Sequence, residues 1–253
     1  MNTAVLKLTI AIKNIKWALS SIFWKKDSSV VIFGSWFGKK FADNPRFLFE
    51  YLSENKDRLG LSHVVWITRS EEVLKTVREL GYEAYLLDSL ESIKYHKIAK
   101  YHIANNAPAS NDKNYKSELF NQFSFRAHKI NLWHGVAVVK GISFDSNDYL
   151  IKRKKHTFIY SVKESFRKNS SFYRKFFEYE GGWGDCYFVA PSVAEMDKMF
   201  RSHMLPEKRF IITGYARNCP CPKLTKEEEA VIDIIKSYKT SIIYMLTFRT
   251  GDN

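Results

Sequence analysis

Short apolar runs alternate along the chain with stretches in which hydrophobic residues recur at helical spacing. The runs are rich in valine, isoleucine and aromatic residues, which favours buried strands, whereas the stretches between them favour amphipathic helices. Strands are predicted at residues 29–33, 63–67, 84–87, 101–104, 130–133, 187–190, 209–213 and 241–246. This alternation predicts an α/β fold in which a Rossmann-like parallel sheet is covered by helices on both faces.

Capping residues mark the predicted starts of several helices. Thr68, Ser192 and Thr225 are each followed three residues later by a glutamate, which is the pattern of a capping box. Asn44 precedes Pro45, and this pair favours a helix with asparagine as the N-cap and proline at the first helical position. Thr68 directly follows a predicted strand, and one residue separates Ser192 from the end of another.

Residues 4–26 predict an amphipathic helix. Its apolar positions recur at helical spacing and are Leu8, Ala11, Ile12, Ile15, Ala18, Leu19 and Ile22. Lys13 and Lys16 interrupt the apolar run, which is therefore too short and too charged to span a bilayer. The segment lacks the small-residue cleavage site of a secretory signal, so we do not interpret it as one. A basic amphipathic helix that carries Trp17 can lie in the interface of an anionic membrane, which is the interpretation we favour; packing on its own domain is the alternative.

Composition adds a strong positive charge to this picture. The chain has 253 residues, of which 45% are hydrophobic, and a formal net charge of +13. Such an excess favours an anionic partner: nucleic acid, an acidic membrane surface or a phosphate-bearing substrate. The basic residues are interleaved with the helices and form no recognition module, so no nucleic-acid partner is expected. The three cysteines form no disulfide framework, and Cys219 and Cys221 lack a second ligand pair, so no metal site is expected.

The candidate chemistry lies where the predicted strand 130–133 ends, because His134 and Gly135 follow Trp133 there. Open α/β sheets bind their ligands at the carboxyl ends of strands. Histidine is the side chain best able to accept a proton near neutral pH. A core histidine in a strand-to-loop turn is the alternative interpretation. Lys140 follows soon after and is a candidate contact for an anion.

Three ordered segments resemble the motifs of one family. Residues 133–140 resemble a Trp-His-Gly-Thr-Pro-like motif that ends in lysine, and residues 214–219 resemble a Gly-Tyr-Pro-Arg-Asn-Asp motif. Residues 246–249 resemble a strand that ends in Pro-Thr-Phe-Arg. Residues 34–38, with 43–45, are similar to the family's N-terminal segment. On these motifs the chain resembles the CDP-glycerol glycerophosphotransferases, a family of teichoic-acid and capsule polymerases and primases.

The resemblance implies a GT-B fold, in which two Rossmann-like domains face each other across a cleft. The chain departs from the motifs at Ala137, Ala216 and Leu246, where proline is usual, and at Cys219, where aspartate is usual. We expect a membrane-associating amphipathic helix at residues 1–27 and a Rossmann-like acceptor-side domain at 28–218. Residues 219–253 are expected to form a linker and the start of a nucleotide-binding domain whose remainder is missing.

The resemblance also implies the reaction: glycerol phosphate moves from CDP-glycerol, or a related CDP-alditol, to a hydroxyl of a lipid-linked polymer, and CMP is released without a cofactor. It implies a peripheral location on the cytoplasmic side of the cell membrane. His134 is the candidate general base, and Arg249 is the candidate for binding the nucleotide. The candidate substrate-binding residues are Lys140, Arg217, Gly135, Asp145 and Asn44. Two alternatives stay open: a non-catalytic module that binds membrane and polymer, and a GT-B sugar transferase.

Overall fold

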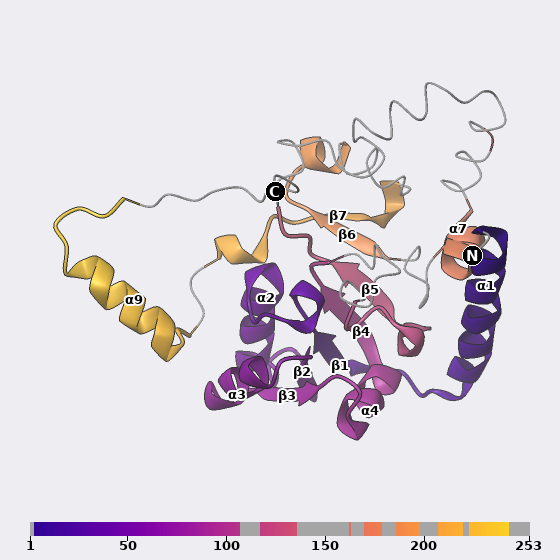
Figure 1. Ribbon diagram of the computed structural model, residues 1–253, viewed down its shortest axis with the longest axis horizontal. Helices are drawn as coiled ribbons and strands as arrows, with labels where there is room; N and C mark the ends of the chain where they lie inside the picture. Colours follow the sequence, from indigo (N-terminus) through magenta and orange to yellow (C-terminus); the bar gives the residue numbers. More distant parts are fainter. Residues whose placement is uncertain are drawn as a thin grey trace. The chain divides into compact units, whose positions relative to one another are not determined.

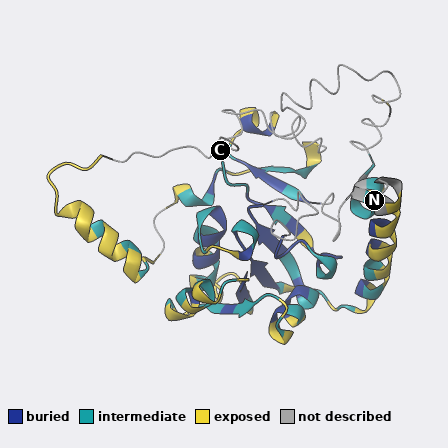
Figure 2. Ribbon diagram, viewed as in Figure 1, coloured by how far each residue is buried: buried dark blue, intermediate teal, exposed yellow. Residues whose placement is uncertain are grey.

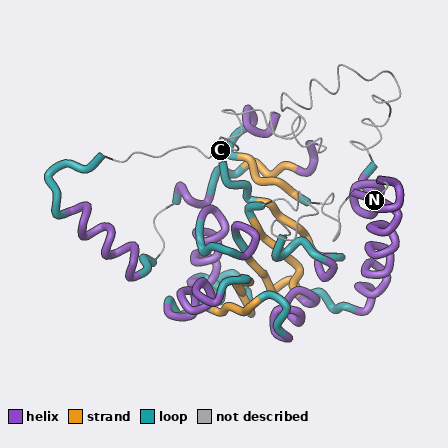
Figure 3. Tube along the Cα trace, in the orientation of Figure 1, coloured by secondary structure: helices purple, strands orange, loops and turns teal. Residues whose placement is uncertain are grey.

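A parallel sheet organises the computed structural model, which describes residues 3–106, 117–135, 162, 170–178, 186–197, 207–219 and 223–242. Within these residues the sheet has seven strands in the order β3-β2-β1-β4-β5-β6-β7, and every neighbouring pair is parallel (Figures 1 and 3). The strands are β1 Asp27–Phe33, β2 His63–Thr68, β3 Glu83–Leu86, β4 Ala99–Ala104, β5 His128–Asn131, β6 Tyr187–Ala190 and β7 Phe210–Ile212. The predicted Rossmann-like parallel sheet is therefore confirmed.

Helices and short helical turns connect the strands (Figure 1). The α-helices include α1 Thr3–Ser20, α2 Asp43–Glu54, α3 Glu71–Glu79, α4 Leu90–Ile98, α7 Ser171–Tyr173 and α9 Lys226–Lys236, and residues 193–197 are helical as well. The 3-10 turns are η1 Ser21–Phe23, η2 Trp36–Gly38, η4 Gln122–Ser124, η8 Glu207–Arg209 and η9 Ala216–Asn218, and η6 Arg174–Glu178 is a π-helix. The turns η2 and η9 lie at the candidate site.

The core has two halves, one on each face of the sheet. On one face α2 contributes Phe49, whose ring lies 5.6 Å from that of Phe33 and 5.2 Å from that of Trp66, measured between centroids. Edge-on aromatic pairs of this kind add about 0.5–1.5 kcal/mol beyond the burial of their area. On the other face Tyr95 of α4 packs in a cluster with Leu119. Helices thus cover both faces, as predicted.

The strand order reverses between β1 and β4, which are neighbours although two strands separate them in sequence. Ligands of open α/β sheets bind in the crevice at such a switch point, beyond the carboxyl ends of the strands. Here Gly34 follows β1 and donates its backbone N–H to Ile103 at 3.1 Å, and Asn105 follows β4. The topology therefore brings the loop at residues 34–38 next to Asn105.

Two of the four predicted helix starts are wrong, and the other two are confirmed. At one of the confirmed starts, the Ser192 hydroxyl accepts the Glu195 N–H at 3.3 Å. The N-cap of α3 is Ser70, whose hydroxyl accepts from the Val73 N–H at 3.3 Å, because the Thr68 hydroxyl instead donates to the Gly38 carbonyl. The N-cap of α2 is Ala42, so Asn44 lies inside the helix and its side chain is used elsewhere. The capping box of Thr225 is present as predicted.

Helix α1 packs on the sheet domain with one side and exposes the other (Figure 2). Ile10 and Asn14 are buried, and the Asn14 amide donates to the Phe176 carbonyl of η6 at 3.0 Å. The exposed side carries a stripe of large apolar residues that continues into η1: Val5, Leu8, Ile12, Ile15, Leu19, Ile22 and Phe23. We call this set the α1 stripe. Among the helices of the described residues, none is long and apolar enough to cross a membrane.

The chain divides into two compact units, residues 1–222 and 223–253. The first unit holds the sheet and α1. The second holds α9, on which Val231, Ile234 and Ile235 are exposed. Of the strand predicted at 241–246, the first two residues are not in a strand, and the others lie outside the described residues.

Candidate functional site

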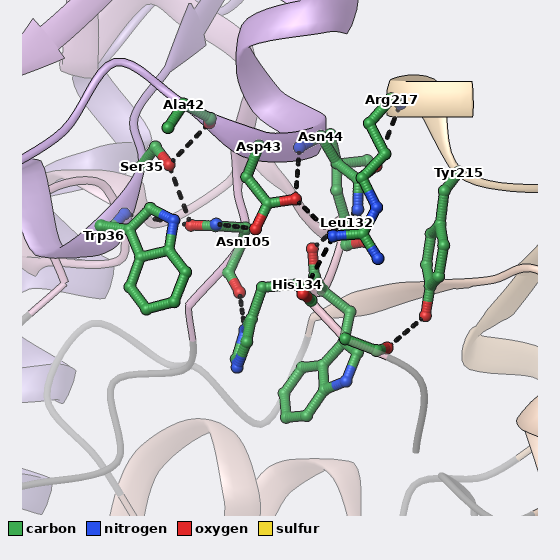
Figure 4. Close-up of polar contacts among 12 residues, drawn as sticks. Ser35, Trp36, Ala42, Asp43, Asn44, Asn105, Leu132, His134, Tyr215 and Arg217 are labelled. Carbon is green, nitrogen blue, oxygen red and sulfur yellow. Dashed lines mark hydrogen bonds and ion pairs between the residues drawn. The ribbon is translucent and has the colours of Figure 1, made fainter. Parts of the chain in front are cut away.

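His134 lies just beyond the carboxyl end of β5, half-buried between two indole rings (Figure 4). Its ring centroid is 4.6 Å from that of Trp133 and 5.3 Å from that of Trp36. Its Nδ1 lies 2.9 Å from the carbonyl oxygen of Asn105. A carbonyl can only accept, so Nδ1 carries the proton and the neutral ring keeps its lone pair on Nε2. The ring is therefore oriented to accept a proton at Nε2.

The loop that carries His134 is held by side chains, because the strand ladder has ended. Strand β5 stops at Asn131, whose side-chain oxygen accepts from the Trp133 N–H at 2.8 Å, and Trp133 has a left-handed φ of 56°. The predicted strand at 130–133 was thus placed two residues too far along the chain. The amide of Asn44, from α2, donates to the carbonyls of Leu132 at 3.3 Å and Trp133 at 3.0 Å. Asn44 therefore fixes the backbone of the two residues that precede the histidine.

Residues of the 214–219 segment hold the next two carbonyls of the same loop (Figure 4). Arg217 Nη1 donates to the His134 carbonyl at 3.1 Å, and the Tyr215 hydroxyl donates to the Gly135 carbonyl at 2.6 Å. Arg217 Nη1 also pairs with Asp43 at 3.0 Å, and the Arg217 side chain is 32% exposed. Its remaining guanidinium nitrogens make no hydrogen bond to the described residues, so they are available to an anion.

A buried acid supports the loop between β1 and α2. Trp36, Phe37 and Gly38 have φ of 49°, 60° and 76°, so three consecutive residues are left-handed. A Cβ atom at Gly34 would overlap the carboxyl of Glu118, which shows how closely the backbone crosses that side chain. Burial raises the pKa of Glu118 to about 7, because the charged form is poorly solvated there.

The Glu118 carboxyl is connected to the loop by one side chain. Asn106 donates to Glu118 Oε2 at 3.4 Å and accepts the Phe37 N–H at 3.4 Å. The other carboxyl oxygen, Oε1, has no hydrogen-bond partner within the described part of the chain. Burying a neutral carboxyl in such a position costs much less free energy than burying a carboxylate there.

A largely apolar cavity of about 820 Å³ adjoins the histidine loop. It lies along α2 and the strands from β4 to β7, and Asn44, Leu132 and Tyr215 belong both to its lining and to the loop contacts. The described residues that line it include no lysine or arginine, so they offer no cation for a pyrophosphate. Among the described residues, Arg217 places a positive charge next to His134.

The structure brings four of the predicted site residues together: His134, Gly135, Asn44 and Arg217. Lys140, Asp145 and Arg249 lie outside the described residues. In the described ranges, no three His, Cys, Asp or Glu side chains are grouped so that they could hold a metal ion.

Sequence reasoning placed Asn105 at the carboxyl end of a strand without giving it a role, and it gave no role to Tyr215 or Glu118. The position of Asn105 directly after a predicted strand was a usable signal, because the carboxyl ends of parallel strands share one edge. Tyr215 lies within a segment that the family resemblance had singled out, but its role in holding a carbonyl depends on tertiary contacts. Glu118 had no local signal.

Known proteins resemble this chain over most of its length. The family model for CDP-Glycerol:Poly(glycerophosphate) glycerophosphotransferase matches residues 16–253. A teichoic acid poly(glycerol phosphate) polymerase of Bacillus spizizenii is 28% identical over 229 residues, which are 88% of this chain and 51% of that protein. This chain thus spans about half the length of that relative.

A solved structure of the wall teichoic acid polymerase TagF, a histidine-to-asparagine variant soaked with CDPG, is similar in fold. Its TM-score is 0.51 at 17% identity, over 93% of this chain and 52% of that one. The family inferred from the three motifs is confirmed by the match over residues 16–253. The chain belongs to the CDP-glycerol:poly(glycerophosphate) glycerophosphotransferase family.

Proposed function

We propose that the protein to which this chain belongs transfers glycerol phosphate from CDP-glycerol, or from a related CDP-alditol, to a hydroxyl of a lipid-linked teichoic-acid-like or capsular polymer. The family membership supports this reaction class. The observation that carries it is the orientation of His134: Nδ1 is occupied by the Asn105 carbonyl, and Nε2 is left to accept a proton.

The proposed reaction needs a base, an aligned phosphate and neutralisation of charge. The acceptor hydroxyl loses its proton to Nε2 of His134, and its oxygen forms a bond to the glycerol-bearing phosphorus. The bond from that phosphorus to the CMP oxygen breaks, and CMP leaves. Such transfers depend mostly on positioning and on positive charge around the phosphoryl group. The Arg217 guanidinium, whose side chain is 32% exposed, supplies one such charge, and Lys140 is predicted to supply a second.

The family's two-domain GT-B arrangement fits a division of labour between the two parts of the chain. The Rossmann-like sheet within 28–218 is proposed to bind the acceptor. The nucleotide is assigned to a domain that begins within 219–253, where Arg249 is the predicted contact. Asn44 and Gly135 then act near the acceptor, and Asp145 is predicted to orient the histidine or cap a turn.

Release of CMP is the test of this function. The protein is incubated with CDP-glycerol and a lipid-linked glycerol phosphate acceptor, and CMP is measured with and without acceptor. Acceptor-dependent release supports the proposal. Release of nucleotide only from sugar nucleotides would instead identify a GT-B sugar transferase. No turnover with any donor, together with retained binding of the polymer, would identify a non-catalytic module.

We also propose that the α1 stripe binds the surface of an anionic membrane, which places the protein peripherally on the cytoplasmic side. The stripe residues recur at helical spacing on the side of α1 that faces away from the domain, and Lys13 and Lys16 are exposed on the same helix. An amphipathic helix of this kind buries its apolar side in the interface while its lysines meet acidic headgroups. The net charge of +13 acts in the same direction.

Replacing Ile12 and Leu19 together by glutamate is expected to lower the affinity for phosphatidylglycerol vesicles by at least about 10-fold, because two apolar contacts are lost and negative charge is added. Co-sedimentation with vesicles measures the effect. The matched control replaces Val231 and Ile234 of α9 by glutamate, because these side chains are similarly exposed. This control is expected to bind the vesicles more tightly than the α1 variant does. Equal binding by the α1 variant and the wild type would remove the stripe from membrane association.

A further inference from the structure

A carboxylate that the proposed mechanism does not use lies one contact away from His134. Asp43 is the first residue of α2, its φ is 64°, and its side chain is only 9% exposed. Left-handed backbone is uncommon outside glycine, although aspartate adopts it more readily than most residues. Strain of this kind costs on the order of 1–3 kcal/mol and persists only where the surroundings hold it. The position therefore calls for a functional explanation.

The two oxygens of this carboxylate join three segments that are far apart in sequence (Figure 4). Oδ1 accepts the Asn44 N–H at 2.8 Å and Arg217 Nη1 at 3.0 Å. Oδ2 accepts the Asn105 side-chain amide at 3.4 Å. Asp43 thus connects the start of α2 with η9 and with the segment that follows β4.

Arg217 and Asn105, the two side-chain partners of Asp43, each also contact His134, and they contact different parts of it. The same Nη1 of Arg217 donates to the His134 carbonyl at 3.1 Å, which fixes the backbone. The Asn105 carbonyl accepts from Nδ1 at 2.9 Å, which fixes the ring and its tautomer. Asp43 therefore acts on the histidine by two separate routes without contacting its ring.

We propose that Asp43 is a positioning residue: its carboxylate holds Arg217 and Asn105 together so that His134 presents Nε2 to the acceptor hydroxyl. As far as turnover is concerned, this inference rests on the proposed function. The orientation of the ring can be measured without turnover, so the two can fail separately.

A purely structural role at the start of α2 is the competing explanation. The bond from Oδ1 to the Asn44 N–H, together with the negative charge in the first turn, would be enough for that role. Asparagine at position 43 keeps the size, the tolerance for left-handed backbone and one acceptor oxygen. It lacks the charge and the second acceptor, so it cannot serve Arg217 and Asn105 together.

The Asp43→Asn variant therefore separates the two explanations. The tautomer of His134 is read from the ¹⁵N chemical shifts of its imidazole nitrogens, assigned by comparison with His134→Gln. The wild type is expected to show Nδ1–H, and the variant is expected to show a mixture with Nε2–H. In the CMP-release assay, kcat is expected to fall by about 10- to 100-fold with a smaller change in KM, because misplacement of a base by about 1 Å costs that much.

The matched control is Glu50→Gln, which removes another carboxylate from α2. Glu50 is buried and pairs with Arg46 at 2.9 Å, so the control tests whether any loss of a buried charge on this helix disturbs the histidine. The control is expected to lower the melting temperature but to leave the His134 tautomer as in the wild type. An unchanged tautomer in Asp43→Asn, or an equal change in Glu50→Gln, overturns the proposal.

A double variant tests whether Asp43 acts through Arg217. Combining Asp43→Asn with Arg217→Lys is expected to reduce kcat little more than the worse single change, because both disrupt one connected unit. Multiplicative losses would show that Asp43 acts independently of Arg217, and would overturn that route. If the wild type releases no CMP, the proposed function fails, and the tautomer measurement alone decides the inference.

Discussion

Replacing His134 by glutamine is expected to lower the rate of CMP release by about 10²- to 10⁴-fold, the contribution typical of a positioned general base. Glutamine can still contact the Asn105 carbonyl through its amide, so the loop is expected to keep its conformation. It cannot take a proton from the acceptor hydroxyl. Initial rates with saturating CDP-glycerol and acceptor measure the effect, and the melting temperature verifies the fold.

A second histidine provides the control for this prediction. His63 lies at the opposite, amino-terminal end of β2, where its Nδ1 is 2.9 Å from Glu83. The His63→Gln variant is expected to turn over at the rate of the wild type. A near-normal rate for His134→Gln would remove the imidazole from the chemistry and leave only its structural contacts.

Replacing Glu118 by glutamine is expected to stabilise the protein at alkaline pH. Burial raises the pKa of Glu118 from 4.5 to about 7 in the folded protein, so the folded state holds its proton to higher pH than the unfolded state does. The free energy of unfolding therefore falls as the pH rises through this window, and the loss is complete above the folded pKa. For a shift of this size the loss is about 3 kcal/mol. Glutamine is neutral throughout and avoids it.

Denaturant unfolding of both proteins at about pH 5 and pH 8.5 measures this effect as a difference between them. The difference is needed because burial also lowers the pKa of Lys26 to about 7, which changes stability with the opposite sign in both proteins. The control is Glu79→Gln, which removes an exposed carboxylate from α3. If stability of the wild type and of Glu118→Gln changes in parallel with pH, the acid is not held neutral by burial.

The fold was largely predictable because its signals are local. Each buried strand of a parallel sheet is an apolar run, and each following helix has its own period, so alternation alone predicted the sheet. The errors arose where tertiary contacts compete with local ones. Thr68 has the spacing of a cap, but its hydroxyl is used by the Gly38 carbonyl. Leu132 and Trp133 are apolar like a strand, but β5 ends at Asn131, and the Trp133 N–H donates to the Asn131 side chain instead of to a neighbouring strand.

The candidate site was predictable in part. The motifs that contain His134 and Arg217 are visible in the sequence, and the fold places them in contact. The spacing of residues cannot show that one nitrogen of Arg217 is shared between Asp43 and a carbonyl, because that depends on the packing of η9 beside α2. The same holds for Glu118, whose raised pKa comes from burial under a loop about 80 residues earlier in the chain.

For the proposed reaction, the histidine loop has a consequence for when the chain becomes competent during its synthesis. Its carbonyls are held by groups at positions 44, 215 and 217, and its ring by position 105, so the parts come from nearly the full length of the first unit. A nascent chain that has emerged only as far as β6 contains the imidazole but not the groups of η9 that secure it. The histidine loop is then completed late in synthesis. Recovery of turnover after refolding would report that the whole domain has folded, whereas spectroscopic signals of the sheet would report only the folding of its early strands.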